Sequence, residues 1–233
     1  MAPVCLITRS QPGASRTAAA VARLGWLPVV VPVAQVVPLP PDPGPLVQGQ
    51  AARAVLLTSA HAARHAPREL HGRTALAVGA ATAAAARTAG FARVRSADGD
   101  AAALATLART DPDMAEGAIW VRGEQVAADL VALLAPDLIP VWPLVVYAMQ
   151  APDDLAAQLA AARAQGPGTV LVHSPAGARA LVQASPGGWQ GWRMVALSPA
   201  AAAPLRTLAG ITIHCATSPD EPSLLNALGP ATP

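Results

Sequence analysis

The chain of 233 residues contains no lysine, and arginine supplies all 16 of its basic residues. Its formal net charge is only +2, and the basic residues form no run. Proteins that bind nucleic acid usually carry a basic patch that neutralises phosphates. We therefore expect no nucleic-acid partner. Arginine is nevertheless well suited to a carboxylate site, because its planar guanidinium binds a carboxylate in a bidentate manner that an ammonium group cannot.

Cysteine and aromatic residues are also scarce. The two cysteines, Cys5 and Cys215, lie in apolar runs typical of strands, so we expect both to be buried rather than to serve a redox or metal site. The five histidines show no metal-site spacing with acidic or cysteine residues, and we expect no bound metal. Aromatic residues make up 3% of the chain, so alanine, valine and leucine must fill its core.

Long apolar runs are missing as well. No window of ~18 apolar residues is free of charge and proline, so we expect no membrane span. The sequence enters a strand-like run, VCLIT, directly after MAP, without the charged and apolar regions of an export signal. These features predict a cytoplasmic protein that does not associate with membranes.

Strand and helix patterns alternate along the whole chain, which predicts βα units and parallel sheets. We expect strands at 4–8, 54–59, 74–79, 92–96, 118–123, 169–174, 193–198 and 211–216. We expect helices at 15–25, 99–110, 124–135, 153–165 and 175–183. Two further helices are predicted to begin near residues 60 and 218, and two are predicted to end at residues 90 and 210. The turn-rich PPDPGP at 40–45 is interpreted as a rigid linker.

A weak internal repeat indicates two similar α/β halves. RTALAVGAATAAAARTAG at 73–90 resembles RMVALSPAAAAPLRTLAG at 193–210. Two extended runs interrupted by proline, 29–40 and 141–152, then connect the halves, since proline cannot donate to a strand ladder. The predicted domains are 1–34 with 151–233, so that the first βα unit packs with the C-terminal half, and 37–147.

The same strand-to-helix corner occurs twice, as VLLTSAHAAR at 55–64 and VLVHSPAGAR at 170–179. A helix that begins at such a corner presents free N–H groups and the positive end of its dipole, and carboxylates or phosphates bind there. Ligands of doubly wound sheets bind at this edge. The corner residues that we regard as candidate binding residues are Arg9, Ser59, Gly79, Thr82, Arg122, Gly123 and Ser174.

Each corner also has a purely structural interpretation. Ser174 followed by proline is a helix cap with a first-turn proline, and capping alone explains any single corner. Arg9 and Arg122 directly follow apolar strands, where each is either a ligand-binding residue or a solvated surface arginine. Tyr147, the only tyrosine, lies in the second connecting run, where packing is its default role. It is also the one plausible proton donor or acceptor.

In order and spacing, LITRS, VLLTSAHA, LAVGAATAAA, VRGE, VVYAMQ, VLVHSPAGARAL and TSPDEPSLLNAL resemble the uroporphyrinogen-III synthase family over nearly the whole chain. The resemblance implies two flavodoxin-like domains joined by a two-stranded linker, and no metal or organic cofactor. It implies that hydroxymethylbilane, a flexible linear tetrapyrrole with many carboxylates, is cyclised in a cleft between the domains to uroporphyrinogen III with inversion of the last ring. Tyr147 matches a tyrosine proposed to assist departure of the substrate hydroxyl. We also expect a monomer that receives its substrate from the preceding enzyme of the pathway.

One corner departs from the family pattern. Where the family has glycine and threonines, this chain reads LSPAAAA at 197–203, so that Ser198 replaces the glycine, and Ala200 and Ala201 replace hydroxyl residues. We expect the backbone N–H groups of Ala200 and Ala201 to bind substrate in their place. The departure also leaves an alternative open, in which the chain is a noncatalytic binding or regulatory protein that holds another anionic ligand in the same cleft.

Overall fold

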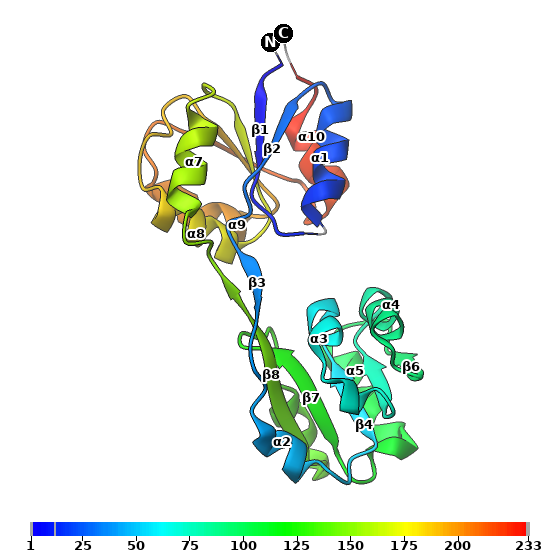
Figure 1. The fold of residues 1–233 in the computed structure, drawn as a ribbon. Helices are drawn as coiled ribbons and strands as arrows, with labels where there is room; N and C mark the ends of the chain where they lie inside the picture. Colours follow the sequence, from blue (N-terminus) through cyan, green and yellow to red (C-terminus); the bar gives the residue numbers. More distant parts are fainter. Residues whose placement is uncertain (1, 12, 232–233) are drawn as a thin grey trace. The chain divides into compact units, whose positions relative to one another are not determined.

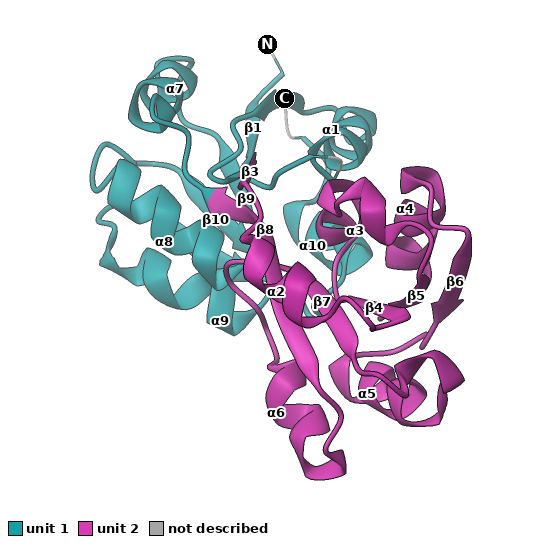
Figure 2. Ribbon diagram, turned by 60° about the horizontal axis from the view of Figure 1, so that its bottom comes forward, with its two compact units in different colours: residues 1–35, 150–233 teal, residues 36–149 magenta. Residues whose placement is uncertain are grey.

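The computed structural model describes residues 2–11 and 13–231 (Figure 1). Contacts between Cα atoms divide the chain into two compact units, coloured separately in Figure 2. Unit 1 contains the residues up to Gln35 and those from Gln150 onward, and unit 2 contains Val36–Met149. Each unit has its own sheet and its own core, and the predicted α/β class with two largely parallel sheets is confirmed.

The sheet of unit 1 is parallel in its four pairings, and its strand order is β2-β1-β9-β10-β11. Numbered within the unit, this is the flavodoxin-like order 2-1-3-4-5. Its N-terminal strand pairs with a strand from the other end of the chain, so the first βα unit packs with the C-terminal half as predicted. The strands are β1 (Val4–Ile7), β2 (Leu27–Val30), β9 (Thr169–Val172), β10 (Arg193–Ala196) and β11 (Thr212–Cys215).

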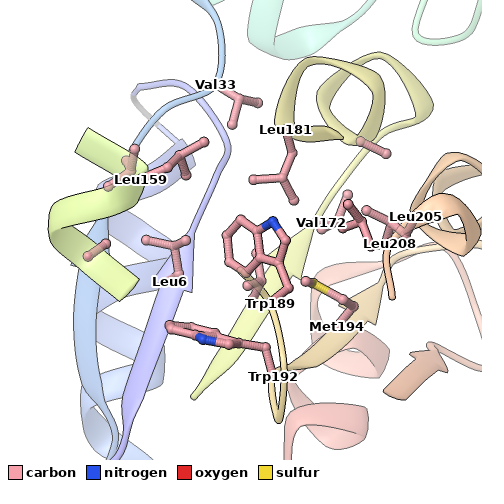
Figure 3. Packing of buried hydrophobic residues seen from close by; sticks show 14 of the residues in the cluster. Leu6, Val33, Leu159, Val172, Leu181, Trp189, Trp192, Met194, Leu205 and Leu208 are labelled. Atoms are coloured by element: carbon pink, nitrogen blue, oxygen red, sulfur yellow. The ribbon is translucent and has the colours of Figure 1, made fainter. Parts of the chain in front are cut away.

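Helices cover both faces of this sheet because successive side chains of β1 point to opposite faces. Leu6 packs with residues of α7, α8 and the α9–η4 region, whereas Cys5 and Ile7 pack with α1 and α10. Trp189 and Trp192 meet edge to face in the first of these layers, as Figure 3 shows, with ring centroids 5.4 Å apart. The helices are α1 (Gly13–Arg23), α7 (Leu155–Arg163), α8 (Pro175–Ala184), α9 (Pro199–Ala202), the 3-10 turn η4 (Ala203–Thr207) and α10 (Glu221–Leu228).

The sheet of unit 2 has the order β3-β8-β7-β4-β5-β6. Its last five strands in chain order form a doubly wound arrangement, 3-2-1-4-5, in which β4 and β7 are central and pair in parallel. β8 also runs parallel to β7, so both strands end at the same edge. The strands are β3 (Gln35–Pro38), β4 (Ala54–Leu57), β5 (Thr74–Ala77), β6 (Arg93–Ser96), β7 (Ala118–Gly123) and β8 (Val141–Gln150).

Two layers of helices also enclose this sheet. Val55 and Leu57 of β4 face residues of α3 and α4, whereas Leu56 faces α5 and α6. Most of these helices are preceded by a residue whose side chain caps them. Examples are Ser59 before α3 and Asp100 before α5. The helices are α2 (Pro43–Gln48), α3 (Ala60–His65), α4 (Ala80–Ala89), α5 (Ala101–Thr110) and α6 (Leu130–Leu134), with the 3-10 turns η1 (Arg68–Leu70), η2 (Pro112–Met114) and η3 (Ala135–Asp137).

Three local predictions are wrong. The predicted linker at 40–45 contains the start of α2, because Asp42 caps the helix and Pro43 occupies its first turn. The helix predicted at 124–135 begins only at Leu130, since Asp129 accepts the N–H groups of Val131 and Ala132 and leaves 124–128 as a loop. Cys215, predicted to be buried, is exposed at the end of the edge strand β11.

The other cysteine behaves as predicted. Cys5 is fully buried in β1, and burial raises the pKa of its thiol to about 12, so the reactive thiolate is suppressed. None of the helices in the described part of the chain is long and apolar enough to cross a membrane.

Candidate active site

In each unit, a cavity lies where the strand order reverses and the neighbouring strands end. The reversal in unit 2 is between β4 and β7. Ser59, two residues after β4, and Gly123, the last residue of β7, line a cavity of about 350 Å³. The reversal in unit 1 is between β1 and β9, and Arg9 and His173 line a cavity of about 480 Å³. Both positions are those at which doubly wound sheets bind ligands.

Tyr147 is the central side chain of the unit 2 cavity. It comes from β8, is 8% exposed, and its hydroxyl lies 3.0 Å from Ser59 Oγ. The ring of Tyr147 packs beside two imidazoles of α3, with centroid distances of 5.7 Å to His61 and 6.1 Å to His65. The structure therefore brings together two residues that are 88 positions apart in the sequence and that sequence analysis proposed separately.

An irregularity in the strand pairing precedes Tyr147. Arg122 pairs with Val145, but Gly123 pairs with Tyr147, so β8 carries one extra residue between the two pairs. Such bulges redirect the side chains that follow them and are frequent beside active sites. The backbone is fixed again directly afterwards, because the N–H of Glu124 donates to the carbonyl of Tyr147 at 2.8 Å.

Arg122 is at the predicted corner but is already engaged. Its Nε donates to the carbonyl of Gly123 at 2.9 Å, and its Nη2 donates to the carbonyl of Glu124 at 2.6 Å. The guanidinium also lies 5.0 Å above the ring of Trp120. These contacts hold the start of the loop at 124–128 in place, and this loop forms one wall of the cavity.

Sequence analysis missed the remaining wall residues. The loop residues Gln125–Ala128 and Asp100 line the cavity, but sequence analysis assigned them to the helices predicted at 124–135 and 99–110. The signal for Asp100 was present, since an aspartate that precedes an alanine-rich helix is a typical cap. Its Oδ1 accepts the N–H groups of Ala102 and Ala103, both at 3.0 Å.

The unit 1 cavity contains a network of charged side chains around Glu221, the first residue of α10. Arg9 Nη1 lies 2.7 Å from Glu221 Oε2, the hydroxyl of Thr17 donates to Oε1, and His173 Nε2 lies 3.3 Å from Oε2. The His173 imidazole, the Thr17 hydroxyl and the Arg9 charge lower the pKa of Glu221 to about 2, although burial opposes the shift. Arg9 is thus paired within the protein.

The other candidate residues lie at helix starts. Ser174 caps α8 by accepting the N–H of Gly177 at 3.0 Å, and Gly79 occupies the corresponding position before α4. Thr82 is 6% exposed in the first turn of α4. Ala200 is exposed, but Ala201 is fully buried, and its N–H already donates to Ser198 Oγ at 3.3 Å. In this conformation the N–H of Ala201 is therefore occupied.

The described residues contain no group of three or more histidine, cysteine, aspartate or glutamate side chains that could hold a metal ion. The features that this structure does provide near its strand ends are a tyrosine, three serine caps and arginines.

A family model described as uroporphyrinogen-III synthase HemD matches residues 15–226. This chain belongs to the uroporphyrinogen-III synthase family. The resemblance found in the sequence is thereby confirmed. A search of curated proteins gave no significant match.

Solved structures of the family share the fold. The uroporphyrinogen-III synthetase of Helicobacter pylori 26695 is 15% identical, with a TM-score of 0.65 over 96% of this chain and 97% of that chain. A mutant uroporphyrinogen III synthase of the extremely thermophilic bacterium Thermus thermophilus is 18% identical, with a TM-score of 0.51 over 96% of each chain. Family and fold together support the predicted synthase function, and no observation favours the noncatalytic alternative.

Proposed function

We propose that this chain cyclises hydroxymethylbilane to uroporphyrinogen III, and that the cavity of unit 2 is where the substrate hydroxyl departs. The proposal is supported by family membership and by the position of Tyr147 at the carboxyl ends of the central strands. Cytoplasmic location, a monomeric state and transfer of the substrate from a preceding enzyme remain predictions.

Tyr147 is proposed as the proton donor. It transfers the phenolic proton to the hydroxyl of the hydroxymethyl group, the C–O bond breaks with its electrons on oxygen, and water leaves. The lone pair of the adjacent pyrrole nitrogen replaces the lost electrons. The last ring attacks the resulting electrophilic carbon with the α-carbon that already carries its methylene bridge, which gives the spiro intermediate. The bond between that α-carbon and the bridge then breaks, the bridge re-bonds to the other α-carbon of the same ring, and the proton lost from that carbon returns to the phenolate. The balance is loss of one water per substrate.

The second titratable group among the described cavity residues is less suited to this role. Asp100 is engaged in capping α5, where its Oδ1 accepts the backbone N–H groups of Ala102 and Ala103. Tyr147 instead presents a hydroxyl group, which can both donate and accept a proton, to the cavity. The single observation that carries the proposal is therefore the Tyr147 hydroxyl beside the cavity.

Carboxylates of the substrate are proposed to bind at the arginines of the unit 1 cavity and at the helix starts of both units. Arg16 lines the unit 1 cavity and is exposed, and Arg9 becomes available when a substrate carboxylate competes with Glu221. A polycarboxylate held at several points needs no reactive nucleophile, since the protein's main task is to orient the chain.

The test adds the protein to freshly prepared hydroxymethylbilane and identifies the cyclic isomer by chromatography after oxidation to the porphyrin. We expect the type III isomer. Tyr147→Phe, which keeps the ring and removes the hydroxyl, should lower kcat by up to ~10²-fold and leave KM within about twofold. The departing hydroxyl is already activated by the pyrrole nitrogen, so a decrease in kcat smaller than ~10²-fold still agrees with the proposed role of Tyr147. Formation of type I product alone would refute the proposed function.

A further inference from the structure

We infer that Ser59 and Gly123 are positioning residues for Tyr147, and that together they leave its phenolic proton free to enter the cavity. Gly123 provides the space in which the ring lies, and Ser59 donates a hydrogen bond to the phenolic oxygen. The inference rests on the proposed role of Tyr147 as the proton donor, and it assigns to Ser59 a role other than direct binding of substrate.

Gly123 leaves the space in which the ring of Tyr147 lies. A Cβ atom added there would lie 2.6 Å from Cζ of Tyr147 and 2.9 Å from its hydroxyl oxygen. Both distances are far below van der Waals contact, so any side chain at this position must displace the ring. The backbone of Gly123 is not in the left-handed region, and the requirement for glycine is therefore one of space rather than of conformation.

The bulge in β8 places Tyr147 opposite Gly123. Because Gly123 is paired with Tyr147 across the irregular register, the residue without a side chain lies directly beside the tyrosine. The carbonyl of Tyr147 is held by the N–H of Glu124, and its ring is enclosed by α3. A side chain at residue 123 would displace the ring and would therefore disturb the contact between its hydroxyl and Ser59.

The hydroxyl of Ser59 takes part in two hydrogen-bond contacts. A serine hydroxyl has one proton and two lone pairs. Ser59 Oγ accepts the N–H of Ala62 at 2.9 Å, which occupies one lone pair, and it contacts the Tyr147 hydroxyl at 3.0 Å. If Tyr147 were the donor in that contact, its proton would be directed at Ser59. If Ser59 is the donor, the tyrosine proton is free.

The second arrangement is the one that serves the reaction. Ser59 keeps its cap on α3 with a lone pair and gives its only proton to the phenolic oxygen. The same bond stabilises the negative charge that develops on that oxygen when Tyr147 releases its proton, because hydrogen bonds to an ionised acceptor are roughly twice as strong as neutral ones. Ser59 thus acts through Tyr147 and need not touch the substrate.

Two substitutions at residue 59 separate this role from helix capping. Glycine is nearly as good a cap as serine but has no hydroxyl, whereas threonine retains both functions. We expect Ser59→Gly to lower kcat at least ~10-fold, given the ~10²-fold scale of general acid assistance, with KM within about twofold and little change in Tm. Ser59→Thr should restore most of kcat. Parental kcat in a folded Ser59→Gly protein would overturn the inference.

A pair of glycine substitutions tests the space. Gly123→Ala should lower kcat by up to ~10²-fold, the scale expected when a catalytic group is displaced by about 1 Å. Gly72→Ala is the matched control in the same unit, because a Cβ there meets no heavy atom within 4 Å. Equal activity of the two variants would contradict the positioning role of Gly123. If Gly123→Ala does not fold, the residue 59 pair still decides.

A measurement without substrate tests the geometry independently of the proposed function. The chain has a single tyrosine, so protein that carries a ¹³C label at the tyrosine Cζ atom gives one phenolic carbon resonance, which reports the hydrogen bond of Tyr147. We expect Ser59→Gly and Gly123→Ala to shift this resonance and Ser59→Thr to restore it. An unshifted resonance refutes the inference. If the resonance shifts but Tyr147→Phe retains full turnover, the proposed catalytic role of the tyrosine fails instead.

Discussion

Replacement of Arg9 by alanine measures how far this arginine serves the substrate and how far it serves the fold. A charge-assisted contact with a substrate carboxylate would be worth ~1.5–3 kcal/mol. In this structure Arg9 is already 2.7 Å from Glu221, and both side chains are 31% exposed. A substrate carboxylate can only exchange with Glu221, so the net gain on binding is smaller, about 1 kcal/mol or less.

We therefore expect Arg9→Ala to raise KM by no more than about fivefold, the factor that corresponds to ~1 kcal/mol. It should also lower the stability of unit 1, because Glu221 loses a partner. Arg16→Ala is the comparison variant, since Arg16 is exposed in the same cavity and is also proposed to bind a substrate carboxylate. The assay compares initial rates over a range of hydroxymethylbilane concentrations with thermal unfolding of each variant. A KM raised ~100-fold by Arg9→Ala with unchanged Tm would refute the reasoning, because it would mean that Glu221 does not compete for Arg9.

Two further predictions concern unit 1. Because the folded-state pKa of Glu221 is lowered from 4.5 to about 2, its contribution to stability is complete above pH 4.5 and is lost as the pH falls toward 2. Since the site is partly exposed and screened by solvent, we expect Glu221→Gln to lower the free energy of unfolding by ~1–2 kcal/mol at pH 7. Plots of unfolding free energy against pH that stay parallel for parent and variant down to pH 2 would contradict this. Ala201→Thr should destabilise the protein by ~1–3 kcal/mol, because it overpacks a fully buried position. Ala200→Thr, at an exposed position of the same turn, is the control and should be nearly neutral. Equal Tm values for the two variants would show that residue 201 has room for the added atoms.

The burial of Ala201 could not be predicted from the sequence. LSPAAAA predicted the helix start correctly, with Ser198 as the cap and Pro199 in the first turn. The burial of Ala201 follows instead from its packing against Ala196, Ala202 and Ile213, which belong to two strands and the helix itself. A substitution that sequence alone favours, a threonine facing a ligand, is therefore a core substitution in this structure.

The strand and helix pattern was predictable because it depends on local sequence. Apolar runs bounded by glycine, serine or aspartate predicted the central strands within a few residues, and the alanine-rich segments after them predicted the helices. The errors at 40–45 and at 124–129 have one cause. An aspartate or a proline was assigned to the wrong side of a helix start, and only its hydrogen bonds decide between a linker and a cap.

The repeated corner explains why sequence analysis predicted only part of the candidate site. Ser59 and Ser174 have nearly the same backbone conformation, with φ and ψ of −151° and 152° in one and −155° and 156° in the other, and each accepts an N–H three residues ahead. Local sequence therefore predicted the same corner twice. What differs is the side chain that a distant element brings to it: Tyr147 at the first corner, by way of a bulge opposite Gly123, and Glu221 beside the second, by way of the start of α10. The chemistry of a repeated corner is thus set by the strand or helix that reaches it from elsewhere in the chain, and the two corners of this protein cannot be exchanged for one another by altering their serines alone.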